Sequence, residues 1–190
     1  MITTTAGQLG AGGGNSTANV LEAGTYPCTL TAAEMYKNFK YQSEEETTQI
    51  TLIWDTGHTV ESESGEDIPV YIYDSFINWT FNEKAKLTER LTALGFNGVN
   101  AKTPIGIDLG GLKSFDELEN IRNGREARKS VEAWEINGEN VFGREALITI
   151  DINDKGYPRV KQASAPIKQP ANNKLKPRTA ANEAPAGAPI

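Results

Sequence analysis

The sequence predicts a mainly β fold with one or two helices, and three observations support this. Apolar and polar residues alternate in several stretches, which is typical of half-buried strands. Just two stretches carry the spacing of a helix instead. Both ends of the chain are rich in Gly, Pro, Ala or Asn and hold few large apolar side chains, so we expect one folded domain over 20–163. The segments 1–19 and 164–190 are then expected to be flexible arms.

Strands are expected where the alternation is clean, in the ranges 24–30, 48–55, 69–79, 131–136, 146–152 and 156–160. The third of these ranges is the most informative. Its two alternating sets place Val70, Ile72 and Phe76 on one face and Tyr71, Tyr73, Ile77 and Trp79 on the other. We expect the first set to face the core and the tyrosines to be open. The sequence Asn153-Asp-Lys-Gly predicts a hairpin turn before the last strand.

A helix is expected over 82–94, where leucines recur at i, i+4 and i+7. Asn82 can cap its start, and Gly95 can end it in a left-handed conformation. A second, shorter helix is expected over 114–122, because Ser114 and Glu117 fit a capping box.

The order of these elements places a helix between the third strand and the later strands. That order fits a small Greek-key barrel of the oligonucleotide-binding (OB) kind. A β-sandwich with a helical insertion fits the same pattern.

The composition argues against most enzyme chemistry. Cys28 and His58 are the single cysteine and the single histidine of the 190 residues. No internal disulfide can form, and a structural zinc site needs about four nitrogen or sulfur ligands. A catalytic triad would depend on His58 alone, which lies in an acidic, loop-like stretch. We therefore expect neither catalysis nor a cofactor nor a bound metal ion.

The chain carries no sign of export or of a membrane segment. It has no run of about 20 apolar residues, and its first residues have neither a basic start nor an apolar core. A cytoplasmic location is expected, which would be that of the host cell if the protein comes from a bacteriophage.

The net charge of −6 hides a strong asymmetry. Eight of the 25 acidic residues lie in 41–69, a range without Lys or Arg, so the remainder has 19 bases against 17 acids. A basic cluster follows later, formed by Arg122, Arg125, Arg128 and Lys129. Because charges are screened beyond about 8–10 Å at physiological salt, the acidic total does not exclude an anionic partner.

Aromatic and basic residues are interleaved at three places that match the nucleic-acid-binding positions of OB barrels. These are the strand 2–3 face and the loops 1–2 and 4–5. Aromatic rings can stack on bases there while cations neutralise phosphates. With the basic cluster, the candidate DNA-binding residues also include Tyr36, Lys37, Phe39, Lys40, Tyr41, Tyr71, Tyr73, Lys155, Tyr157 and Arg159. The alternative is that these rings simply complete a half-buried sheet.

Three segments together carry a family resemblance. They are Pro69-Val-Tyr-Ile-Tyr-Asp-Ser-Phe, the run from Asn82-Glu-Lys-Ala-Lys-Leu to Leu91-Thr-Ala-Leu-Gly-Phe, and the run from Gly143-Arg-Glu-Ala-Leu-Ile-Thr-Ile to Lys155-Gly-Tyr-Pro-Arg-Val-Lys. Over Gly24 to Pro166 the chain resembles small single-stranded DNA-binding proteins of bacteriophage replication modules, which have an OB fold. Bacterial-type relatives end in an acidic tail with a terminal Phe, whereas this tail is basic and rich in Pro and Ala.

The resemblance implies sequence-tolerant binding of single-stranded DNA during replication or recombination, without catalysis or metal. Phage replication proteins and a second copy of the chain are further expected partners. The rival hypothesis is a virion structural protein, such as a decoration or tail component. In that case the Gly-rich and Pro-rich arms would extend over neighbouring subunits and bind them.

Overall fold

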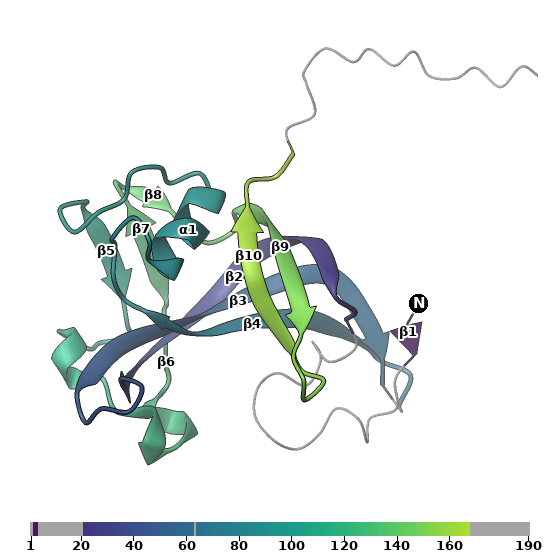
Figure 1. Cartoon of the computed structure of the whole chain (residues 1–190), viewed down its shortest axis with the longest axis horizontal. Coiled ribbons are helices and arrows are strands. Elements are labelled where there is room, and N and C mark those ends of the chain that lie inside the picture. Colours follow the sequence, from purple (N-terminus) through teal and green to yellow (C-terminus); the bar gives the residue numbers. More distant parts are fainter. Residues whose placement is uncertain (1, 4–20, 63, 168–190) are drawn as a thin grey trace, which may run out of the picture.

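The computed structural model describes residues 2–3, 21–62 and 64–167. They form a mainly β structure with one α-helix, as predicted (Figure 1). Most of the two predicted arms lies outside the described residues. From the first arm, β1 (Ile2–Thr3) runs parallel to Val60 and Glu61, and from the second, Ser164 ends the last strand.

The main sheet is built on three long antiparallel strands. They are β2 (Gly24–Phe39), β3 (Glu46–Glu61) and β4 (Asp67–Asn78). The hairpin of β9 (Glu145–Ile152) and β10 (Pro158–Ser164) joins the first half of β2, and β6 (Lys129–Ser130) joins its second half. The predicted hairpin turn at Asn153 is confirmed, and Gly156 adopts a φ of 80° there.

The strand order β4-β3-β2-β9-β10 is that of an OB barrel that remains open. A closed barrel would need β4 and β10 to pair. In the described part of the chain these two strands touch without forming a ladder. The prediction of a mainly β fold is therefore confirmed, while the barrel is not closed.

Strand β2 is much longer than predicted, and midway along it the core-facing residues change from even-numbered to odd-numbered positions. Cys28 and Leu30 are buried, and after a bulge between Leu30 and Ala32 the buried residues are Ala33 and Met35. A bulge adds one residue to one strand, so the alternation shifts by one position. Residues 36–39 pair with residues 46–49 of β3, so they belong to β2 and not to the loop that follows it, which corrects the prediction.

Strand β4 has a second bulge, which overturns part of the predicted pattern. Val70 and Ile72 are buried as expected, whereas Tyr71, which was expected to be open, is half-buried. Thr51 of β3 faces two residues of β4, because Ile50 pairs with Ile77 and Leu52 with Asp74. Beyond that point the faces are exchanged. Ile77 is buried, and Phe76, which was predicted to face the core, is 58% exposed.

The predicted helix exists as α1 (Lys86–Ala93), but it starts later than Asn82. The Asn82 side chain accepts from the backbone N–H of Lys84 in a turn before the helix, and no side chain caps the helix itself. Gly95 ends the helix as predicted, with a φ of 94° and its N–H bonded to Thr92. The N–H of Phe96 reaches the carbonyl of Leu91, which completes a Schellman motif.

The prediction of a second helix over 114–122 is wrong. Three short 3-10 turns occupy that region: η3 (Phe115–Glu117), η4 (Ile121–Asn123) and η5 (Arg125–Ala127). Ser114 does cap the first turn by accepting from the N–H of Asp116. Glu117 reaches past Ser114 to the N–H of Lys113, so the reciprocal bond of a capping box is missing.

A small second sheet was only partly predicted. It consists of β5 (Ile105–Asp108), β7 (Ala133–Ile136) and β8 (Glu139–Asn140). Trp134 and Ile136 of β7 are fully buried. No helix within the described ranges is long and apolar enough to cross a membrane.

Candidate nucleic-acid interface

The side of β2, β3 and β4 opposite the core carries part of the predicted site, and we call it the open face. Its residues are Glu34, Tyr36, Thr51, Ile53, Tyr71, Tyr73 and Phe76. Cross-strand pairing brings them together, because Glu34 lies opposite Thr51 and Ile53 lies opposite Tyr73. Strand β4 is at the edge of the ladder, so Tyr71 and Tyr73 line one margin of this face.

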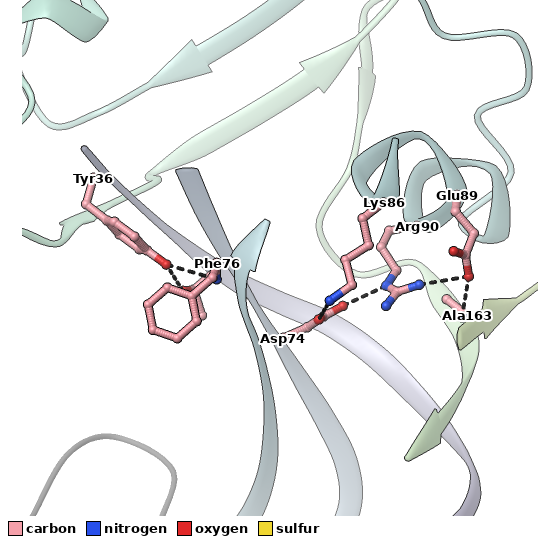
Figure 2. Close-up of polar contacts among 8 residues, drawn as sticks. Tyr36, Asp74, Phe76, Lys86, Glu89, Arg90 and Ala163 are labelled. Carbon is pink, nitrogen blue, oxygen red and sulfur yellow. Dashed lines mark hydrogen bonds and ion pairs between the residues drawn. The ribbon is translucent and has the colours of Figure 1, made fainter. Parts of the chain in front are cut away.

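Tyr36 lies in the floor of the open face and is completely buried. Its hydroxyl is 3.0 Å from the hydroxyl of Thr51 and accepts from the backbone N–H of Phe76 at 3.1 Å (Figure 2). The guanidinium of Arg128 lies over the face of the Tyr36 ring, 4.8 Å from its centroid. Tyr36 therefore offers no free ring surface for a base, although the sequence suggested that it would.

Two arginines of the turn region act on this face, Arg128 by direct contact and Arg125 through its charge, and they differ in their pairing. Arg128 donates to Thr51 at 3.3 Å and lies 3.5 Å from a carboxylate oxygen of Glu34, so its charge is partly neutralised. Arg125 is exposed and makes no ion pair with any described carboxylate.

The Arg125 charge acts on the phenol of Tyr73. Burial raises the pKa of Tyr73 above its usual value, and the negative charge of Glu34 raises it further, while Arg125 lowers it. Tyr73 is therefore a neutral, half-buried ring at neutral pH, within the electrostatic influence of an exposed cation. An aromatic ring and a cation in one region match the base and the phosphate of a nucleotide.

The other candidate residues of the segment 36–41 lie elsewhere. Strand alternation places Lys37 and Phe39 on the opposite side of the sheet from Tyr36. Arg122 lies over the Phe39 ring at 4.4 Å, and the Lys37 ammonium donates to the carbonyl of Asp116. These two basic residues therefore do not belong to the open face.

The β2–β3 turn holds Lys40 and Tyr41. The Lys40 ammonium is 2.5 Å from Glu45, so an acidic neighbour offsets its charge. Tyr41 is 90% exposed. Lys129 lies in β6, beside Met35 of β2.

The candidate residues of the β9–β10 hairpin are separated from the open face by most of the length of β2. Lys155, Tyr157 and Arg159 surround the β9–β10 turn, which lies beyond Gly24. Along β2, Gly24 and Glu34 are roughly 30 Å apart at about 3.3 Å per residue. The structure thus places Tyr71, Tyr73 and Arg128 on the open face, with Arg125 near enough to influence Tyr73, and leaves the hairpin residues at a distance.

The features that would suggest catalysis or metal binding are weak. No cluster of three or more His, Cys, Asp or Glu side chains that could hold a metal ion occurs among the described residues. His58 is exposed, and one of its ring nitrogens is 2.9 Å from the carbonyl of Thr56.

Cys28 should be chemically inert in the folded protein. Burial raises the pKa of its thiol to about 12, and the charge of Asp55 adds to this effect. Because the thiolate is the reactive form, we expect iodoacetamide at pH 8 to modify native Cys28 far more slowly than urea-unfolded Cys28. Mass spectrometry over time measures both rates, and equal rates would contradict the buried position.

No family model, curated protein or solved structure matches this chain.

Proposed function

We propose that the protein binds single-stranded DNA, without sequence preference, across the open face. The observation that carries this proposal is the half-buried ring of Tyr73 on the edge strand, within the electrostatic influence of the exposed guanidinium of Arg125. Tyr71 lies two residues away on the same side of the edge strand. Stacking of a base on an aromatic ring contributes about 1–3 kcal/mol and tolerates any base.

The strand order supports the same reading. In OB folds the face of the second and third strands binds nucleic acid, and these correspond here to β3 and β4. The resemblance to phage single-strand binders adds a role in replication or recombination. The protein then acts by binding and carries out no reaction.

The salt dependence of binding tests the electrostatic part of this proposal. Affinity for a labelled oligo-dT, measured by fluorescence anisotropy, is expected to fall as salt rises, with a log–log slope of about −0.7 per neutralised phosphate. Arg125→Gln is expected to weaken binding at low salt and to reduce the magnitude of that slope by about 0.7.

Lys102→Gln is the matched control. It makes the same change of charge at an exposed loop position before β5, so the affinity and the slope should both stay as in the wild type. A folded wild-type protein that ignores oligo-dT at low salt would rule out the proposed function. Equal losses in the two variants would show that the net charge matters and the open face does not.

A further inference from the structure

Phe76 has an unusual backbone for an aromatic residue. It lies in the bulge of β4 with a φ of 61°, in the left-handed region that bulky side chains avoid. The residue is 58% exposed, although an apolar ring gains from burial. Both features are unfavourable for the folded protein alone, and bulges often redirect a side chain beside a functional site.

The surroundings hold Phe76 in this position. The buried hydroxyl of Tyr36 accepts from its backbone N–H at 3.1 Å, and the same hydroxyl bonds to Thr51 (Figure 2). The two rings meet edge to face, with centroids 6.4 Å apart. Tyr36 is itself fixed beneath the guanidinium of Arg128. Phe76 is therefore anchored through its backbone and its ring contact with Tyr36, and more than half of its surface stays exposed.

The bulge also places this ring in a row with two others. Tyr71 and Tyr73 point to the open face by simple alternation, and the extra residue in β4 turns Phe76 to the same side. Without the bulge, Phe76 would follow Val70 and Ile72 into the core. The edge strand thus presents three aromatic side chains in succession, and the third is the most exposed of them.

We propose that Phe76 is a base-stacking residue for single-stranded DNA, and that Tyr36 is its positioning residue. This inference rests on the proposed function and deepens it. An unpaired base stacks on the outward side of the Phe76 ring, while the Tyr36 hydroxyl keeps the bulge in the conformation that presents this ring. Arg125 and Arg128 contact the phosphates on either side of that base.

Two probes separate stacking from charge. Phe76→Ala is expected to weaken binding of oligo-dT by about 5- to 150-fold, which corresponds to the loss of one stacked base. Binding of an abasic oligodeoxynucleotide of the same length should stay unchanged, because it keeps the phosphates and lacks the bases. Phe76→Trp is expected to retain the wild-type affinity for oligo-dT.

Ile167→Ala is the control, because it removes an exposed apolar side chain beyond the end of β10 that is not a candidate binding residue. It is expected to leave the affinity for oligo-dT unchanged. A loss in Ile167→Ala with none in Phe76→Ala would overturn the assignment of Phe76.

Tyr36→Phe tests the positioning role, since it keeps the ring and removes the hydroxyl. It is expected to weaken oligo-dT binding in the wild-type background and to have no further effect in a Phe76→Ala background. Equal losses in the two backgrounds would show that Tyr36 does not act through Phe76.

The two proposals fail in different ways. If the wild type does not bind oligo-dT, both are wrong. If the wild type binds and Arg125→Gln weakens binding while Phe76→Ala does not, the proposed function stands and the assignment of Phe76 is overturned.

Discussion

Replacing Asp74 with alanine is expected to lower the free energy of unfolding by about 3–5 kcal/mol, because it removes the buried one of the two carboxylates that pair with a buried arginine. Asp74 of β4 is 2% exposed and Arg90 of α1 is completely buried. A carboxylate oxygen of Asp74 accepts from Nε of Arg90 at 2.6 Å. The exposed ammonium of Lys86 is 3.5 Å from the other oxygen.

This ion pair also ties the helix to the far edge of the sheet. Arg90 donates to Glu89 at 2.8 Å, and the same oxygen of Glu89 accepts from the backbone N–H of Ala163 in β10 at 3.0 Å (Figure 2). The network therefore connects β4 and β10, the two strands that do not pair with each other among the described residues. Its loss should weaken the contact across the open side of the barrel.

Urea unfolding of three variants measures this effect. Asp67→Ala removes an exposed carboxylate from the same strand and is expected to change the stability by less than about 0.5 kcal/mol. The double variant Asp74→Leu/Arg90→Met removes both charges, and we expect it to be clearly more stable than Asp74→Ala alone. A loss below about 1 kcal/mol in Asp74→Ala would contradict the buried ion pair.

The sequence predicted the strands well wherever alternation was uninterrupted. Val70 and Ile72 face the core as expected, because a period of two follows directly from strand geometry. The two bulges could not be predicted in this way. A bulge is defined by two residues that face one residue of the partner strand, as at Thr51, and the register of that pairing is not visible in one strand alone.

In the candidate site, too, some positions could be predicted from the sequence and others could not. The outward position of Tyr73 follows from alternation, whereas that of Phe76 depends on the bulge. The contact of Arg128 with Tyr36 joins residues far apart in the chain, and spacing carries no signal for it. A signal for the buried ion pair was available, because Asp74 has the same parity as Ile72 and a charge on a core face needs a partner.

Ile72→Ala and Tyr73→Ala should have opposite effects, because neighbouring residues of β4 face opposite sides of the sheet. Ile72 is 2% exposed, so its truncation is expected to cost about 2–5 kcal/mol of stability and to leave the affinity of the folded protein for oligo-dT unchanged. Tyr73 is half-buried on the open face. Its truncation should cost less stability than the roughly 3–5 kcal/mol of a fully buried aromatic residue.

Tyr73→Ala is also expected to lose about 1–3 kcal/mol of binding free energy, because one stacking surface for a base is removed. Urea unfolding and anisotropy on both variants give the four quantities that the comparison needs. If Tyr73→Ala unfolds the protein while Ile72→Ala has no effect, the two faces of β4 are exchanged. If Tyr73→Ala keeps the wild-type affinity while Arg125→Gln loses it, the phosphates are bound at the open face and the bases are not stacked on Tyr73.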